Sequence, residues 1–207
     1  MIKNIIFDMG NVLIPFDRQV FLKAAADSEE DRQFLNREVF QSLEWLQTDS
    51  GDLTVPQAVA VLQERLPARF HGAIAGLFYD WIDLTEPWSG MERLVTELKE
   101  QGYGVYLLSN VSGYFHEFKH KIPAVSHMDG LFISADYRML KPYPEIYKKF
   151  LSVFSLEPAE CLFIDDLPIN IYGAARAGIE GIVFHGEESL RRDLRRYDVQ
   201  PAFLRRT

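Results

Sequence analysis

Short apolar runs separated by longer amphipathic segments form the main pattern of this chain. The runs are Ile5 to Phe7, Val105 to Leu108, Leu131 to Ile133, Cys161 to Ile164 and Gly181 to Phe184. Runs of this length, rich in β-branched and aromatic residues and bounded by polar residues or glycine, predict buried strands. Because helical patterns lie between them, they predict an α/β fold in which a doubly wound parallel sheet carries helices on both faces.

A long helical segment interrupts this alternation between residues 17 and 86. Apolar residues recur in it at helical spacing, with one set at Phe34, Leu35, Val39 and Leu43 and another at Val55, Ala58, Val59 and Leu62. The segment is too long for a single crossover between two strands. We therefore interpret residues 17–86 as an inserted helical cap domain, and residues 1–16 and 87–207 as the core that carries the sheet.

Two polar positions in the predicted cap allow alternative interpretations. Asp17 precedes a helical pattern and is expected to cap that helix, although its closeness to Asp8 leaves the alternative that it reaches a site there. The segment 48–53 breaks the helical pattern, and Thr54 is the expected cap of the next helix. This break is either a loop that contacts substrate or a solvated connection. Several aromatic side chains either line a substrate pocket or belong to the hydrophobic core, namely Phe70, Phe78, Tyr79, Trp81 and Trp88.

Further helices are predicted between the strands of the core. One apolar face is formed by Met91, Leu94, Val95 and Leu98, and another by Ile146, Phe150 and Val153. A helix over residues 169–177 is expected to end at Gly178, and a basic helix is expected over residues 191–196. Each of these segments follows or precedes a predicted strand, as a doubly wound sheet requires.

Composition and charge narrow the class of protein. The chain of 207 residues has 22 basic and 30 acidic side chains and a net charge of −8, so nucleic acid is not an expected partner. Cys161 is the only cysteine, which excludes an internal disulfide and a cysteine-built metal site. No apolar stretch approaches a membrane span, and because the first residues lead directly into the first predicted strand we expect no signal peptide. We therefore expect a cytoplasmic protein that acts away from membranes, as a monomer or a weak dimer.

Polar residues follow several predicted strands at the point where each strand ends. Asp8 follows the first strand, Ser109 and Asn110 follow the second, and Asp165 and Asp166 follow a later one. In open α/β sheets the carboxyl ends of the strands form the ligand crevice, so these side chains are expected to meet there. Taken one at a time, each also fits an ordinary turn or cap, because Asp, Asn and Ser are common at such positions.

With Lys141, these residues have the chemistry of a phosphoryl-transfer site. Asp8 is the candidate nucleophile, since a carboxylate can attack phosphorus and form an aspartyl-phosphate. Lys141 precedes a predicted helix and offers a point charge that neutralises phosphoryl oxygens and holds the nucleophile. Ser109 and Asn110 can bind and orient the same group. A solvated surface lysine and a capping Ser-Asn pair are the alternatives.

Asp165 and Asp166 indicate a metal site. Two adjacent acids at the end of a buried strand repel each other unless a cation compensates their charge. Mg²⁺ takes hard oxygen ligands and keeps a substrate phosphate in its shell, so we expect Mg²⁺ as the cofactor. The alternative is a pair of helix-capping residues.

The ordered set of motifs resembles that of the haloacid dehalogenase (HAD) superfamily of phosphohydrolases over nearly the whole chain. The stretch from Phe7 to Val12 resembles the first motif of its bacterial α-glucose-1-phosphate phosphatases. The resemblance implies a Rossmann-like core with an inserted cap. It also implies that Asp166 is the direct metal ligand with Asp165 beside it, and that Asp8 and the main-chain carbonyl of Gly10 complete the protein's ligands.

Gly10 is the main departure from the family pattern. Most phosphatases of the superfamily have a second aspartate at this position, which acts as general acid and then as general base, and that side chain is absent here. The resemblance also places Asn170 where the family has a further, often acidic, site residue. Loss of the acid is expected to affect the choice of substrate and the rate. The main-chain carbonyl of Gly10, which the resemblance makes a metal ligand, is retained.

The expected function is Mg²⁺-dependent hydrolysis of a small phosphorylated metabolite, such as a sugar 1-phosphate, through an aspartyl-phosphate on Asp8. A 2-haloacid dehalogenase shares the nucleophile and lacks the second aspartate, but it needs no metal, so the pair Asp165-Asp166 argues against it. A sugar-phosphate mutase also uses the missing acid. A catalytically weakened protein that binds a phosphometabolite, or regulates through it, is the non-enzymatic alternative.

Overall fold

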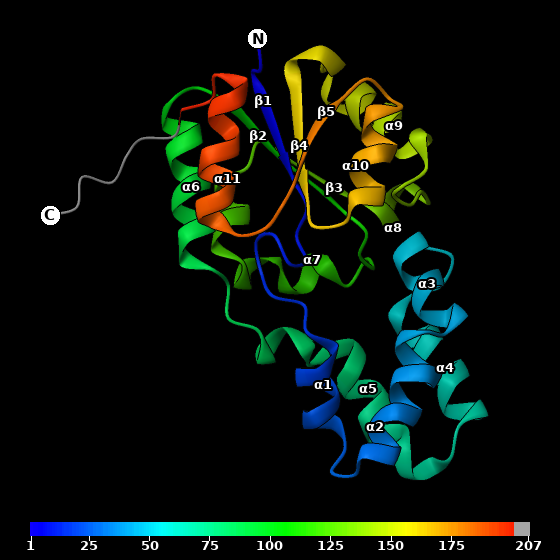
Figure 1. The fold of residues 1–207 in the computed structure, drawn as a ribbon. Coiled ribbons are helices and arrows are strands. Elements are labelled where there is room, and N and C mark those ends of the chain that lie inside the picture. Colours follow the sequence, from blue (N-terminus) through cyan, green and yellow to red (C-terminus); the bar gives the residue numbers. More distant parts are fainter. Residues whose placement is uncertain (201–207) are drawn as a thin grey trace, which may run out of the picture.

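The computed structural model describes residues 1–200, and within them a five-stranded parallel sheet carries helices on both faces (Figure 1). The strands are β1 (Asn4–Phe7), β2 (Gly104–Ser109), β3 (Gly130–Ile133), β4 (Cys161–Asp165) and β5 (Glu180–Val183). Their order across the sheet is β3-β2-β1-β4-β5. The predicted α/β fold with a doubly wound parallel sheet is confirmed.

Both faces of the sheet are buried because successive side chains of a strand point to opposite sides. Ile5 and Phe7 belong to the hydrophobic cluster that contains the apolar faces of α6 (Ser89–Glu100) and α11 (Glu187–Leu194). Ile6 belongs to the cluster of α9 (Pro144–Phe154) and α10 (Pro168–Ala175) on the other face. Burial on both sides is the reason that the strands are continuous apolar runs in the sequence.

The direction of winding changes next to β1. The chain passes from β1 to β2 and β3 on one side, and then crosses to β4 and β5 on the other. Phe7 pairs in register with both Leu107 and Ile164, so Asp8 leaves the sheet at the level at which β4 ends with Asp165. Open α/β sheets bind their ligands at such a switch point, outside the carboxyl ends of the strands.

A second group of helices lies beyond the carboxyl edge of the sheet rather than on its faces (Figure 1). These helices, which we call the cap, are α1 (Arg18–Ala25), α2 (Glu29–Leu35), α3 (Leu43–Ser50), α4 (Val55–Arg65) and α5 (His71–Tyr79). As predicted, the described chain has no strand between residues 17 and 86. One hydrophobic cluster nevertheless contains side chains of the cap and of the core, so the two are packed together. The division into domains at residues 16 and 86 stays a prediction.

Two predicted helix caps are confirmed in this group of helices. The Asp17 side chain accepts a hydrogen bond from the backbone N–H of Gln19 (2.8 Å) and begins α1. Thr54 and Gln57 form a reciprocal capping box at the start of α4. Each cap satisfies backbone donors that the first turn of a helix leaves without partners.

Three details of the expected elements are wrong. The helix α3 continues through Ser50 and ends on Gly51, which has a φ of 76°, so the break in the cap begins at residue 51 rather than 48. Val153 is 38% exposed and does not contribute to the buried face of α9. The last helix, α11, begins at Glu187, before the expected start at residue 191, and a 3-10 helix (Arg195–Tyr197) follows its end at Leu194.

Two short helices, α7 (Phe115–Phe118) and α8 (Ser134–Tyr137), follow β2 and β3 at the edge of the sheet that faces the cap.

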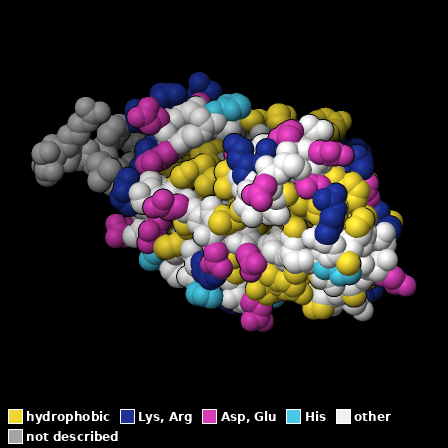
Figure 2. Space-filling view, turned by 90° about the horizontal axis from the view of Figure 1, so that it is seen from below, with side chains coloured by type: hydrophobic (Ala, Val, Ile, Leu, Met, Phe, Trp, Pro, Cys, Tyr) yellow, Lys and Arg dark blue, Asp and Glu magenta, His cyan; other side chains and the backbone are white. Residues whose placement is uncertain are grey.

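Helices of residues 1–200 are all too short or too polar to cross a membrane. On the face shown in Figure 2, Lys and Arg side chains are scattered among Asp and Glu rather than gathered into one basic patch. Both signs of charge therefore lie side by side on this face, and the expectation that nucleic acid is not a partner stays a prediction.

Candidate active site

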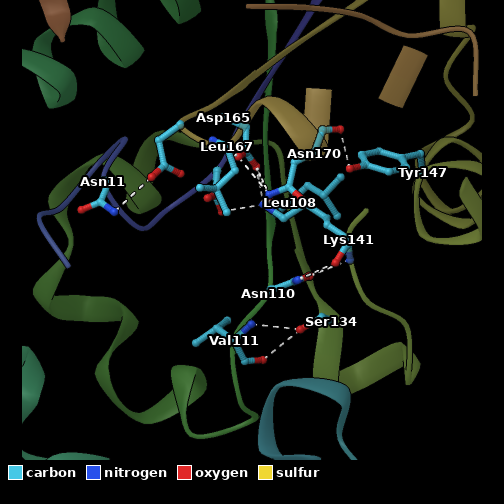
Figure 3. A network of polar contacts seen from close by, with 12 residues as sticks. Asn11, Leu108, Asn110, Val111, Ser134, Lys141, Tyr147, Asp165, Leu167 and Asn170 are labelled. Carbon is cyan, nitrogen blue, oxygen red and sulfur yellow. Dashed lines mark hydrogen bonds and ion pairs between the residues drawn. The ribbon is translucent and has the colours of Figure 1, made fainter. Parts of the chain in front are cut away.

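The ammonium group of Lys141 connects the first and last motifs of the sequence. Its Nζ lies 2.8 Å from Asp8 Oδ1 and donates to Asp165 Oδ2 (2.7 Å) and to the carbonyl of Leu108 (3.1 Å) (Figure 3). These three contacts use all the donors of an ammonium group. Because Lys141 is only 5% exposed, the three contacts fix Asp8 at the carboxyl end of β1.

Burial and neighbouring charges shift the pKa values of Lys141 and Asp8 in opposite directions. Burial by itself would lower the pKa of Lys141, but the charges of Asp8 and Asp165 outweigh this effect and raise it. Burial raises the pKa of Asp8 from 3.8 to about 6, and the charge of Lys141 opposes that shift. At neutral pH the lysine is therefore charged and Asp8 is mostly ionised, which is the form of a carboxylate that attacks phosphorus.

Asp165 is completely buried, and hydrogen-bond donors surround its carboxylate. Its Oδ1 accepts from the backbone N–H of Leu167 (2.8 Å) and from Asn170 Nδ2 (2.9 Å). Its Oδ2 accepts from Lys141 and also lies 3.0 Å from Asn170 Nδ2. Asn170 is thus at the site, as the family resemblance implied, and it holds Asp165. The carboxylate of Asp165 is therefore occupied in positioning Lys141.

Asn110 forms a two-way contact with the backbone of Lys141. Its Oδ1 accepts from the Lys141 N–H (2.9 Å), and its Nδ2 donates to the Lys141 carbonyl (3.0 Å). The contact connects the loop after β2 to the segment before α9 and places the lysine side chain beside Asp8. Ser109 is buried at the end of β2 and lines the same cavity as Asp8.

Asn11 is a site residue that the sequence analysis missed. Its Nδ2 donates to Asp166 Oδ2 (3.1 Å), and its Oδ1 accepts from the backbone N–H of Phe16 (2.9 Å). Its φ of 55° lies in the left-handed region, which asparagine enters more readily than most residues. Asn11 therefore both shapes the turn after Asp8 and orients Asp166. The only signal in the sequence is its place after Gly10 in a turn.

The acidic side chains fit a divalent cation. One carboxylate oxygen from each of Asp8, Asp165 and Asp166 lies within 4.8 Å of the others. Burial raises the pKa of Asp166, although its hydrogen bond from Asn11 acts in the opposite direction. With all three acids ionised, one lysine leaves two negative charges uncompensated, and hard oxygen donors of this kind are the ligands that Mg²⁺ prefers.

A cavity of about 550 Å³ lies between the sheet and the cap. Its walls at the sheet end include Asp8, Gly10, Ser109, Asn110, Lys141, Asp166 and Asn170. Its walls toward the cap include Phe16, Arg18, Trp45, Thr48, Asp49, Phe78 and Trp81. The candidate site residues predicted from the sequence therefore surround one cavity. Asp165 is the exception, because it is completely buried and does not line the cavity.

Only some of the aromatic and loop residues that the sequence offered as pocket residues line this cavity. Of the aromatic candidates, Phe78 and Trp81 do so, whereas Phe70, Tyr79 and Trp88 are not among its lining residues. Thr48 and Asp49 line it from the last turn of α3, but the residues of the break that follows do not. Asp17 caps its helix and does not line the cavity.

Comparison with known proteins gives related hydrolases. A sesquiterpene phosphatase of Aspergillus oryzae is 30% identical over 87% of this chain and 88% of its own. A D-ribitol-5-phosphate phosphatase of Bacteroides thetaiotaomicron is 29% identical over 87% of this chain and 90% of its own. A solved HAD family enzyme of Bacteroides thetaiotaomicron, in complex with magnesium and inorganic phosphate, has a TM-score of 0.68 and 25% identity, covering 88% of this chain and 93% of that one.

The family assignment rests on most of the chain rather than on one motif. The haloacid dehalogenase-like hydrolase family matches residues 2–178, a range that contains every residue of the cavity described above. The family resemblance stated from the sequence is confirmed, and so is the expectation of a hydrolase. This chain belongs to the haloacid dehalogenase-like hydrolase family.

Proposed function

We propose that the protein is a Mg²⁺-dependent phosphatase that hydrolyses a small phosphorylated metabolite through an aspartyl-phosphate on Asp8. The observation that carries this proposal is the fixed contact between Lys141 and Oδ1 of Asp8 at the end of the cavity (2.8 Å). The contact holds one carboxylate oxygen and leaves the other for attack on phosphorus. The names of the relatives support a phosphorylated substrate.

The metal would be held by Asp8, Asp166 and the main-chain carbonyl of Gly10, all of which border the cavity. Bound there, Mg²⁺ would neutralise charge on the phosphoryl oxygens. That Asp165 is a ligand as well stays a prediction, since its oxygens already accept hydrogen bonds from Lys141, Leu167 and Asn170. Replacement of Asp166 by alanine should weaken the Mg²⁺ dependence more than replacement of Asp165 by asparagine does.

A sugar phosphate, in particular a sugar 1-phosphate, is the substrate that we propose. Aromatic rings such as Trp45 and Trp81 can pack on the C–H faces of a sugar, while Arg18 and Thr48 can bind its hydroxyl groups. The position of Gly10 carries no carboxyl group to protonate a leaving oxygen. An anomeric oxygen carries negative charge better than a primary one, which favours the 1-phosphate.

An isoprenoid phosphate is a second candidate, because four aromatic side chains line the cavity. They are Phe16, Trp45, Phe78 and Trp81. An apolar chain would bury against these rings without the need for hydroxyl-binding groups. A 2-haloacid dehalogenase is a weaker candidate, since its chemistry has no use for a cluster of acids that fits a divalent cation.

A phosphate-release assay tests the proposal. Sugar 1-phosphates, sugar 6-phosphates and isoprenoid monophosphates are offered to the wild-type protein and to Asp8→Asn, with Mg²⁺ and with a chelator. We expect release only from the wild type with Mg²⁺, and the preferred group of substrates chooses between the two candidates. Equal release by a folded Asp8→Asn protein would exclude the covalent mechanism, and tight binding without turnover would favour the regulatory alternative.

A further inference from the structure

The site as described has a nucleophile but no assigned proton donor for the leaving oxygen. Gly10 has no side chain, and Lys141 already uses its three donors on Asp8, Asp165 and Leu108. Asp8 is the attacking group. The described residues that line the cavity include no histidine, cysteine or tyrosine. Among its charged residues, Arg18, Asp49 and Asp166 remain.

Asp49 differs from the other two in position and chemistry. A guanidinium is a poor proton donor, and that of Arg18 lies over the ring of Phe40, 5.4 Å from the centroid. Asp166 accepts a hydrogen bond from Asn11 and belongs to the cluster of acids that fits a cation. Asp49 belongs to α3 of the cap and lines the cavity from the cap.

The backbone at Asp49 is attached to the core. Ser134, at the start of α8, donates from its Oγ to the carbonyl of Asp49 (2.6 Å) and accepts from the backbone N–H of Val111 (2.9 Å), as Figure 3 shows for Val111. Val111 directly follows Asn110, which holds Lys141. A β-carbon on Gly51 would lie 2.1 Å from the carbonyl oxygen of Ala135, so the backbones also approach closely there. The backbone of Asp49 is thus connected, through Ser134 and Val111, to the loop that positions Lys141 at the phosphate end of the cavity.

The carboxyl group of Asp49 is set up to remain protonated. Burial raises its pKa from 3.8 to about 8, and the charge of Arg18 opposes the shift only in part. In the described structure its carboxyl group has no hydrogen-bond or ion-pair partner, in contrast to Asp8 and Asp166. It also lies in the last turn of α3, where the helix dipole disfavours a negative charge. The other charged groups that line the cavity are Arg18, Asp8, Lys141 and Asp166.

We propose that Asp49 is the general acid and base of the reaction, a role that rests on the proposed phosphatase function. In the first step Asp8 bonds to phosphorus, the bond from phosphorus to the leaving oxygen breaks, and that oxygen takes the proton of Asp49. In the second step the Asp49 carboxylate takes a proton from water while the water oxygen bonds to phosphorus and the bond from phosphorus to Asp8 breaks. Phosphate leaves, and both side chains return to their starting forms.

A series of leaving groups tests this role. We compare Asp49→Asn with wild type on 4-nitrophenyl phosphate, a sugar 1-phosphate and a simple alkyl phosphate, whose leaving groups need increasing help from an acid. General acid catalysis contributes about 10²- to 10⁴-fold, so kcat/KM should fall by that factor for the alkyl phosphate and by less than about tenfold for the nitrophenyl ester. The alkaline fall in the rate of alkyl phosphate hydrolysis should disappear in Asp49→Asn.

Asp52→Asn is the matched control, because Asp52 bonds to Ser50 Oγ (2.6 Å) and does not line the cavity. It should leave all three substrates and the pH profile unchanged. An equal loss for all three substrates in Asp49→Asn would overturn the role of Asp49 while leaving the phosphatase function intact. A wild-type protein that releases phosphate from none of them would instead overturn the proposed function itself.

Discussion

Replacement of Asp49 by asparagine should stabilise the folded protein at neutral pH. The unfolded chain holds this carboxyl group at its ordinary pKa of 3.8, whereas burial in the fold raises the pKa to about 8. At pH 7 folding must therefore protonate a group that the unfolded chain ionises. One pKa unit corresponds to about 1.4 kcal/mol, so this protonation costs roughly 4 kcal/mol at most. Solvent in the cavity screens the group, and we expect a gain of about 1–3 kcal/mol.

The dependence on pH gives this prediction its sign. The unfavourable contribution of Asp49 is absent below its unfolded pKa of 3.8, grows as the pH rises, and reaches its full size above about 8. Urea unfolding of wild type, Asp49→Asn and Asp52→Asn between about pH 5 and 8 measures it. The advantage of Asp49→Asn over wild type should increase with pH, while Asp52→Asn should show none. An advantage that is absent, or constant over this range, would refute the assignment of a neutral Asp49.

Three further variants test other parts of the site. Lys141→Met leaves buried carboxylates without their partner, so in metal-free buffer the free energy of unfolding should fall by about 3–5 kcal/mol; an unchanged urea midpoint would contradict this. Asn11→Gly keeps the left-handed turn but loses the bond to Asp166, so the Mg²⁺ concentration for half-maximal activity should rise about 10- to 100-fold, and an unaltered titration would remove Asn11 from the site. Gly10→Asp added to Asp49→Asn should recover alkyl phosphate hydrolysis, because a β-carbon at Gly10 meets only the β-carbon of Phe16 (3.7 Å); no recovery would place the lost activity elsewhere.

The sheet and the phosphate end of the site could be predicted because their signals are local. Each strand is an apolar run with a polar residue at its end, and parallel strands bring those ends to one edge. Asp8 and Ser109 lie at that edge, as expected. Lys141 lies beside them, as its place in the ordered set of motifs predicted. Asn170 could be placed near the site only through the family resemblance.

Other features depend on contacts that no local pattern reveals. The amide of Asn110 bonds to the backbone of Lys141, 31 residues away, so its positioning role could not be inferred from its type alone. Asn11 reaches Asp166 across 155 residues. Asp49 was expected in a loop, yet it lies in the last turn of α3, because Gly51 and not Thr48 ends that helix. The hydrogen bond from Ser134 that attaches its backbone to the core could be seen only in the folded chain.

Detection of phosphate bound covalently to Asp8 is the most direct test of the central claim. The wild-type protein is mixed with a preferred substrate and Mg²⁺, quenched in acid within the first turnover, and analysed by peptide mass spectrometry. We predict one phosphoryl group on the peptide that contains Asp8, absent when Mg²⁺ is chelated and absent in Asp8→Asn. Phosphate release by the wild type with no phosphoryl group on Asp8, or a group on another residue, would contradict the account.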